Sequence, residues 1–304
     1  MSKWTTSDIP DQSGRAAVIT GTGGLGLEDA AALARAGAEV IIAGRSAQKG
    51  AAAVSHIRQQ APSVAVRFEQ VDLGSLESIE MFAQRLRSQR DSLDVLINNA
   101  GVMTPPRRQT TSDGLELQFG TNHLGHFALT AGLLPLLRRS PNPRIVSLGS
   151  VAARTGAIDF DNLNGEKSYT PMVAYRQSKL ACLMFALELQ RRSEANGWGV
   201  TSVAAHPGVS RTDLLHNAPG RRSLAAIARS MLWFMFQPVA QGALPTLYAA
   251  TSPDAKAGGY YGPARLAETR GHPAEAKIPA QALEADVAAR LWERSAALTG
   301  ANFG

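Results

Sequence analysis

Short apolar runs alternate with longer amphipathic segments through most of the chain. The runs expected to form strands are 15–20, 39–43, 64–71, 93–97, 144–148 and 199–205. The segments expected to form helices are 27–37, 46–60, 75–90, 114–138 and a long one containing Tyr175. Strands that alternate with helices predict a parallel sheet covered by helices on both faces. No internal repeat or long linker interrupts the alternation, so we predict one doubly wound α/β domain over residues 1–304.

A glycine-rich turn, Gly21-Thr22-Gly23-Gly24-Leu25-Gly26, follows the first strand and leads into the first helix. Glycines allow the backbone to approach a pyrophosphate, and a helix N-terminus offers free N–H groups and a positive dipole end. In this strand–turn–helix–strand setting, the turn predicts a dinucleotide site in preference to a tight turn without a ligand.

The residue after the second strand indicates which dinucleotide is bound. An acidic side chain there would hydrogen-bond the adenosine ribose and repel a 2′-phosphate. This chain has Gly44-Arg45, and an arginine can pair bidentately with a phosphate. NADP(H) is therefore favoured over NAD(H), unless Arg45 is simply an exposed arginine at the start of a helix.

Tyr175 and Lys179 are the strongest candidates for acid–base chemistry. They are four positions apart at the start of a run of good helix formers, so they lie on one face of a helix. A free tyrosine has a pKa of about 10 and transfers protons poorly at neutral pH. A neighbouring ammonium favours the phenolate form, which suits proton exchange with an alcohol or carbonyl oxygen. The alternative is that both side chains lie at the border of an exposed helix face and have no catalytic role.

Several polar or turn-forming residues stand where expected strands end, namely Asp72, Asn99, Ser150 and Pro207-Gly208. In a doubly wound parallel sheet, ligands bind outside the carboxyl ends of the strands. The sequence therefore predicts that these positions meet at one site.

Taken in order, these motifs resemble the short-chain dehydrogenase/reductase family over about residues 14–215. The residues that carry the resemblance are Thr20-Gly21 to Gly26, Asp72-Leu73, Asn98-Asn99-Ala100-Gly101, Asn122, Ser150, Tyr175-x-x-Ser178-Lys179 and Pro207-Gly208. Segments 113–127, 158–163 and 259–263 are similar to the retinol dehydrogenase-like and WW-domain oxidoreductase-like branch. The resemblance implies a Rossmann fold with a core over 14–210, a substrate-lid region over 211–245 and a C-terminal extension over 246–304.

By this resemblance the catalytic residues are Asn122, Ser150, Tyr175 and Lys179. Tyr175 would be the acid/base, Lys179 would assist it and hold the nicotinamide ribose, and Ser150 would bind the substrate oxygen. Asn122 would position a water that relays protons to Lys179. The cofactor would contact Gly21, Gly24, Leu25, Gly26, Arg45, Asp72, Leu73, Asn99, Ala100, Gly101, Tyr175, Lys179, Pro207, Gly208 and Thr212.

Two spacings depart from the common family pattern. Ser150 and Tyr175 are 25 positions apart, which is longer than usual but typical of the retinol dehydrogenase-like branch. The glycine turn has two residues, Thr22 and Gly23, where the family usually has three. We therefore expect NADPH binding that is detectable but weaker than in a variant with one residue, Asn or Ser, inserted after Thr22.

Composition limits the partners and the compartment. The net charge of +6 comes mostly from scattered arginine pairs without interleaved aromatics, which indicates a solvated surface and no nucleic-acid partner. There is no apolar run of transmembrane length and no apolar signal-peptide core in residues 1–10. The single cysteine, Cys182, is expected in the core, and His123 and His126 are expected on a helix face without a metal. These features favour the cytoplasm.

The stretch 224–236 is rich in methionine and aromatic residues and favours an apolar substrate lid over a helix lying on a membrane. The helix after Tyr175 is apolar on nearly every side, which predicts burial against a second subunit, as in a homo-oligomer, or core packing alone.

The leading hypothesis is an NADP(H)-dependent oxidoreductase that interconverts an apolar ketone or aldehyde with an alcohol. The alternatives are a non-catalytic dinucleotide sensor or scaffold, and the same fold reducing a carbon–carbon double bond.

Overall fold

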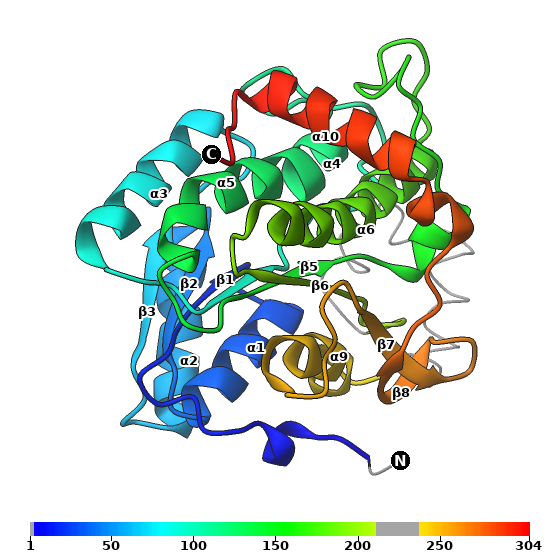
Figure 1. Ribbon diagram of the computed structural model, residues 1–304. Helices are drawn as coiled ribbons and strands as arrows, with labels where there is room; N and C mark the ends of the chain where they lie inside the picture. Colours follow the sequence, from blue (N-terminus) through cyan, green and yellow to red (C-terminus); the bar gives the residue numbers. More distant parts are fainter. Residues whose placement is uncertain (1–2, 211–236) are drawn as a thin grey trace.

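The computed structural model describes residues 3–210 and 237–304, which build one eight-stranded sheet (Figure 1). The strands are β1 (Ala16–Thr20), β2 (Glu39–Gly44), β3 (Val66–Gln70), β4 (Val95–Asn98), β5 (Arg144–Leu148), β6 (Thr201–Ala205), β7 (Tyr260–Arg265) and β8 (Arg270–Glu275). Their order is β3-β2-β1-β4-β5-β6-β7-β8. Neighbouring strands pair in parallel as far as β7, and β8 returns antiparallel to β7.

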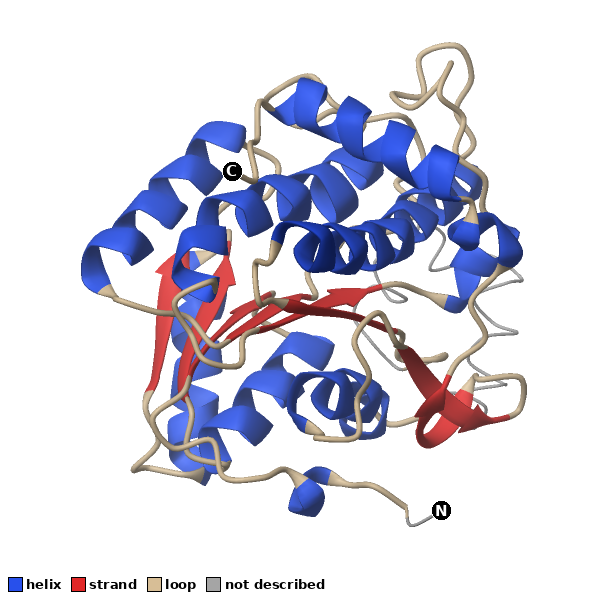
Figure 2. Ribbon diagram, in the orientation of Figure 1, coloured by secondary structure: helices blue, strands red, loops and turns tan. Residues whose placement is uncertain are grey.

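Helices cover both faces of the sheet. The α-helices are α1 (Gly24–Arg35), α2 (Ala47–Gln60), α3 (Leu76–Gln89), α4 (Leu117–Phe119), α5 (Gly125–Leu137), α6 (Pro171–Asn196), α9 (Val239–Thr251) and α10 (Ala285–Thr299). Shorter turns of helix are η1 (Thr6–Asp8), η2 (Gly120–Leu124), η3 (Val151–Thr155) and η5 (Ala280–Leu283). Figure 2 shows α1, α2 and α9 on one side of the sheet, and α3, α5 and α6 on the other.

Side-chain alternation along the strands divides the core between these two layers. In β2, Val40 and Ile42 pack with α1, α2 and α9, whereas Ile41 points to the layer of α3 and α5. Successive side chains of a strand point to opposite faces, so a strand buried on both faces is apolar throughout. This confirms the predicted doubly wound sheet.

Two expected helices have different boundaries from those predicted. The first begins at Gly24, inside the glycine turn. The segment predicted as one helix over 114–138 is interrupted by η2, a π-helical turn that contains Asn122. Residues 239–245, which the sequence assigned to a lid, belong to helix α9, whereas Thr212 and the stretch 224–236 lie outside the described residues.

The apolar helix α6 is covered by elements of its own chain. Trp292 of α10 stacks on Phe185 of α6 with ring centroids 5.8 Å apart, and Phe303 packs on Trp292 at 4.4 Å. In Figure 1, α10 (red) lies outside α5 and α6. The sequence left open whether the apolar surface of this helix packs against a second subunit or within the core. The structure shows core packing within a single chain.

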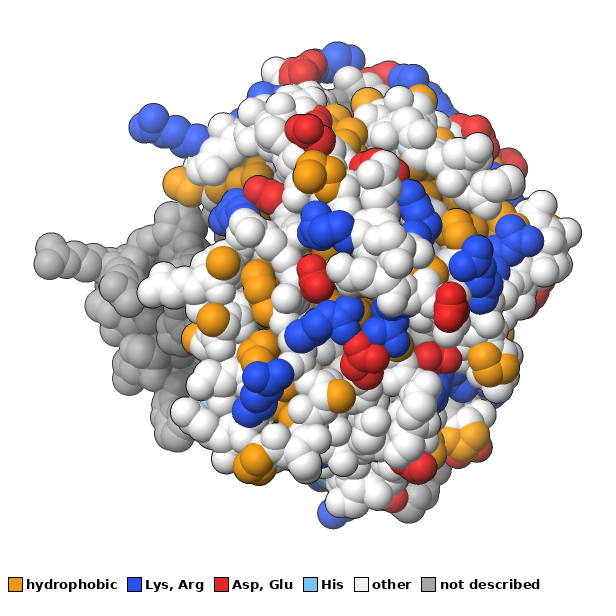
Figure 3. Space-filling view, turned by 90° about the vertical axis from the view of Figure 1, so that its left-hand side faces the viewer, with side chains coloured by type: hydrophobic (Ala, Val, Ile, Leu, Met, Phe, Trp, Pro, Cys, Tyr) orange, Lys and Arg blue, Asp and Glu red, His pale blue; other side chains and the backbone are white. Residues whose placement is uncertain are grey.

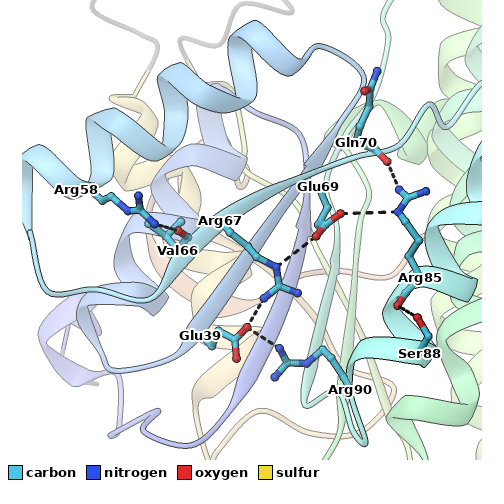
Figure 4. A network of polar contacts seen from close by, with 9 residues as sticks. All are labelled: Glu39, Arg58, Val66, Arg67, Glu69, Gln70, Arg85, Ser88 and Arg90. Carbon is cyan, nitrogen blue, oxygen red and sulfur yellow. Dashed lines mark hydrogen bonds and ion pairs between the residues drawn. The ribbon is translucent and has the colours of Figure 1, made fainter.

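Charged side chains of both signs are mixed on the face of the molecule drawn in Figure 3. In the view of Figure 3, Lys and Arg are interspersed with Asp and Glu. At the β2–β3 edge, Glu39 pairs with Arg67 and with Arg90, the latter at 2.6 Å (Figure 4). Hydrogen bonding to Arg90 lowers the pKa of Glu39. Arginines on this edge thus form surface ion pairs, which agrees with the solvated surface predicted from the sequence.

Among the described residues, no helix has both the length and the apolarity required to cross a membrane.

One carboxyl group in α1 opposes folding. Asp29 is fully buried, and within the described part of the chain neither of its carboxylate oxygens has a hydrogen-bond partner. Burial raises the pKa of Asp29 well above its usual range. The pH-dependent cost of burying such an acid is absent below its unfolded pKa of about 3.9, and it grows as the pH rises toward the folded pKa.

We therefore expect Asp29→Asn to raise Tm at neutral pH and to have little effect near pH 4. The amide keeps the buried polar atoms but cannot ionise, so the gain is the ionisation cost alone, and each kcal/mol of it corresponds to roughly 2–4 °C in Tm. Thermal melts across this pH range measure the effect, and Asp254→Asn, at an exposed position, is the control for a lost carboxylate. A Tm difference that does not grow with pH would contradict the buried-carboxyl explanation.

Candidate active site

Tyr175 and Lys179 project from the amino-terminal part of α6 into a cleft of about 830 Å³. The helix starts at Pro171, a residue whose fixed φ suits the first helical position. Tyr175 is 8% exposed and Lys179 is 6% exposed, so both groups are largely shielded from water. Lys179 Nζ donates to the Leu148 carbonyl at the end of β5, at 3.0 Å. That bond uses one of three ammonium hydrogens and leaves the others available in the cleft.

Ser150 lines the same cleft from the segment after β5. It is the N-cap of η3, and its Oγ accepts a hydrogen bond from Ala152 N at 3.2 Å. Because this bond uses the oxygen as an acceptor, the hydroxyl hydrogen remains available to a substrate oxygen. The long segment between Ser150 and Tyr175 still brings the two residues to one cleft.

Asn122 lies behind the cleft and is not among the described residues that line it. Its Oδ1 accepts from Val102 N at 2.7 Å, and its Nδ2 donates to Val102 O and Ser178 Oγ, both at 3.0 Å. Ser178 Oγ in turn donates to the Tyr175 carbonyl at 2.8 Å. The Asn122 side chain thus joins the segment after Gly101 to the tyrosine helix.

The Asn122 carbonyl also has protein partners. It accepts from His126 Nδ1 at 2.9 Å and from Cys182 Sγ at 3.1 Å. His126 Nδ1 must carry the hydrogen, so His126 Nε2 accepts from Thr20 Oγ1 at 2.9 Å. Burial lowers the pKa of His126 to about 4, which keeps the ring neutral. The two histidines predicted on a helix face, His123 and His126, are therefore buried hydrogen-bonding residues, and Cys182 is buried as expected.

The glycine turn forms the cleft wall next to α1. Gly21 has φ 104° and Gly24 has φ 54°, the left-handed region that favours glycine. A Cβ at Gly26 would lie only 2.6 Å from Asn99 Nδ2, the atom that donates to Thr20 O at 2.7 Å. Helix α1 begins at Gly24 after Gly23, which has no side chain to cap the first N–H groups. The turn therefore fits an anionic group such as a pyrophosphate, even though it is one residue short.

The remaining predicted cofactor residues fall into two groups. Those in the cleft lining are Gly21, Gly24, Leu25, Asn99, Ala100, Gly101, Tyr175, Lys179, Pro207 and Gly208. Gly26 packs behind the turn, and Arg45, Asp72 and Leu73 are not among the described residues that line the cleft. Asp72 Oδ1 instead accepts from Gly74 N at 2.9 Å and shapes the turn after β3.

Lys49 and His56 line the cleft from α2 and were not identified from the sequence. They lie seven positions apart, which is about two helical turns, so they project from one face of α2. That spacing was visible in the sequence, but only packing shows that this face looks toward Thr22 and Gly23.

Known proteins similar to this chain agree with these features. The sequence profile described as short chain dehydrogenase matches residues 15–222. Mouse polyprenol dehydrogenase is 40% identical over 302 residues, covering 97% of this chain and 87% of that protein. Human retinol dehydrogenase 13 is 40% identical over 295 residues, covering 94% and 85%.

Two solved structures extend the comparison. A protein of Mycobacterium paratuberculosis superposes with a TM-score of 0.83 at 38% identity, over 100% of both chains. The Pseudomonas aeruginosa RhlG/NADP active-site complex has a TM-score of 0.64 at 25% identity, over 82% of this chain and 94% of that one. The chain therefore belongs to the short-chain dehydrogenase/reductase family of oxidoreductases, in its retinol dehydrogenase-like branch.

Proposed function

We propose that this enzyme interconverts a ketone or aldehyde with an alcohol, using NADP(H) and an apolar substrate. The observation that carries the proposal is that Tyr175, Lys179 and Ser150 line one cleft together with the glycine turn. Bound NADPH would supply the hydride, which is the chemistry of the cofactor itself. The chain's own residues would hold the substrate oxygen and supply its proton.

The proton donor in the reduction direction is Tyr175. Its phenol would donate a proton to the carbonyl oxygen as that oxygen gains negative charge, and Ser150 Oγ would donate a hydrogen bond to the same oxygen. Lys179, held at the Leu148 carbonyl, would stabilise the phenolate that remains. Shielding of both groups from water strengthens this electrostatic effect.

An apolar substrate is supported by the cleft wall. The same cleft is also lined by Met103, Val151, Met172 and Val209. Methionine side chains adapt to apolar ligands of irregular shape. The names of two similar enzymes, polyprenol dehydrogenase and retinol dehydrogenase 13, also refer to apolar alcohols.

The experiment that tests the function has two steps. Fluorescence titration measures binding of NADPH and NADH, and a panel of aliphatic aldehydes, ketones and enones of increasing chain length is then followed by nicotinamide absorbance. We expect tighter NADPH binding and alcohol products, with turnover rising for longer chains. NADPH binding without turnover of any compound would favour a sensor, and saturated ketones formed from enones would favour double-bond reduction.

Cofactor choice is expected to depend on basic residues at the adenosine end of the cleft. Arg45 follows β2 and is exposed, and Lys49 lines the cleft one helical turn later. A charge-assisted phosphate bond is worth about 1.5–3 kcal/mol, or roughly ten- to a hundredfold in affinity. We expect Arg45→Asp to move preference from NADPH toward NADH, and Lys49→Met to weaken NADPH binding more than NADH binding.

Parallel titrations of both variants with each cofactor measure these changes. Arg35→Gln, at the far end of α1, is the control for loss of one positive charge. An unmodified enzyme that already prefers NADH would show that neither residue contacts a 2′-phosphate.

A further inference from the structure

The β7–β8 hairpin has a turn with unusual backbone conformation. Leu266, Ala267 and Glu268 have φ values of 50°, 51° and 64°, so three consecutive residues with side chains lie in the left-handed region. Such residues are strained, and they persist only where surrounding contacts hold them. The turn lies outside residues 15–222, the part that the family profile matches.

One set of contacts ties this turn to the segment that carries Ser150. Arg154 of η3 donates from Nη1 to the Ala267 carbonyl at 2.9 Å and from Nη2 to Glu268 Oε2 at 2.5 Å. Ser150 is the N-cap of the same short helix. Glu268 is 114 positions from Arg154, so this contact exists only through the tertiary fold.

A second set ties the turn to the Pro207-Gly208 wall. Gly208 N donates to His206 Nδ1 at 3.2 Å, so His206 Nδ1 must accept and Nε2 must carry the hydrogen. His206 Nε2 lies 3.0 Å from Glu268 Oε2 and therefore donates to it. Val209 N donates to the Thr269 carbonyl at 2.9 Å, and a Cβ on Gly208 would lie 2.3 Å from that oxygen. The hairpin thus touches this wall at two points.

The charge states fit this arrangement. Burial lowers the pKa of His206, whose side chain is fully buried, and the hydrogen bond from His206 lowers the pKa of Glu268 to about 2. A neutral imidazole then lies between a main-chain donor and an anionic acceptor. The same oxygen, Glu268 Oε2, also accepts a hydrogen bond from the Arg154 guanidinium.

We propose that Glu268 is a positioning residue that holds the Ser150 segment and the Pro207-Gly208 wall in a fixed relation across the cleft. It acts through Arg154 on one side and through His206 on the other. This inference rests on the proposed function, in which Ser150 binds the substrate oxygen and Pro207-Gly208 contacts the nicotinamide side. The C-terminal hairpin is thereby part of the machinery that aligns the substrate oxygen with the hydride.

The first test compares three variants on the intact enzyme. Glu268→Ala removes the carboxylate that contacts both Arg154 and His206, and it leaves the main-chain contacts of Ala267 and Thr269 in place. Glu268→Gln keeps the shape without the charge. Glu275→Gln breaks the exposed pair that Glu275 of the same hairpin makes with Lys256. We expect Glu268→Ala to lower kcat at least about tenfold with a smaller change in the substrate KM, because a misplacement of about 1 Å can cost about 10²-fold. Glu268→Gln should lie between, and Glu275→Gln should match the unmodified enzyme.

The second test separates positioning from a general loss of structure. If Glu268 acts partly by holding Ser150, then Glu268→Ala should reduce kcat by a smaller factor in a Ser150→Ala background than in the unmodified enzyme. Thermal melts establish whether each variant is folded. If Glu268→Ala is unfolded, Glu268→Gln is used in its place in both backgrounds. Full kcat in a folded Glu268 variant, or losses that multiply fully in the double variant, would overturn the proposal.

A direct titration with NADPH distinguishes failure of this inference from failure of the proposed function. Loosening His206 should weaken NADPH binding severalfold in Glu268→Ala, whether or not a carbonyl substrate is turned over. If the unmodified enzyme is inactive but Glu268→Ala binds NADPH more weakly than it does, the result would count against the proposed reaction and not against the positioning role of Glu268. If the unmodified enzyme is active and the Glu268 variants keep its kcat and its NADPH binding, the result would count against the positioning role of Glu268 alone.

Discussion

Tyr175→Phe is expected to lower kcat by about 10²–10⁴-fold, the usual size of a general acid–base contribution. The substitution keeps the ring, which is largely buried against the cleft wall, and removes only the hydroxyl that would donate the proton. NADPH binding should therefore persist. Steady-state kinetics on any compound from the carbonyl panel, together with a fluorescence titration, measures both quantities.

The matched control is Tyr248→Phe. Tyr248 lies on α9, where it packs against Trp4 and Tyr261 and does not line the described cleft. Its loss of a hydroxyl should leave kcat unchanged. Unaltered turnover in Tyr175→Phe on every active substrate would remove Tyr175 from the mechanism.

The second large effect is expected from lengthening the glycine turn. Insertion of one Asn after Thr22 should tighten NADPH binding roughly ten- to a hundredfold, because one more N–H could reach a phosphate oxygen and a charge-assisted bond contributes about 1.5–3 kcal/mol. The cleft wall formed by Gly21 to Leu25 already presents the first turn of α1, so the unmodified chain should still bind detectably.

Insertion of Pro at the same place controls for length, because proline lengthens the turn without adding a donor. The gain should be absent from the Pro variant. Equal or tighter NADPH binding by the unmodified chain would mean that the short turn is an effective phosphate site in its own right.

Much of the site was predictable because its signals are local. The spacing of Tyr175 and Lys179 places them on one helix face whatever surrounds the helix, and an apolar run followed by glycines predicts a strand that leads into a phosphate-binding turn. The order of strands and helices also determined that Ser150 and Pro207-Gly208 would stand at the same edge of the sheet, and both line the cleft. The assignment of roles to these residues stays a prediction for the kinetic tests above.

The tertiary structure decided what depends on contacts between distant segments. Periodicity gives no sign that Asn122 lies in a π-helical turn, or that its carbonyl accepts from His126 and Cys182. Burial of α6 beneath α10 required Trp292 to meet Phe185 across more than a hundred residues.

The cleft residues differ in the same way. Lys49 lines the cleft because of how α2 packs beside the glycine turn, whereas Arg45, identified from its position after β2, does not. The tie from Glu268 to His206 and Arg154 joins residues 62 and 114 positions apart. By itself, the sequence determined the elements and the chemistry that each one carries, because helix and strand periods are local. Only packing decided which side chains meet, because contact between remote residues depends on the positions of all the elements between them.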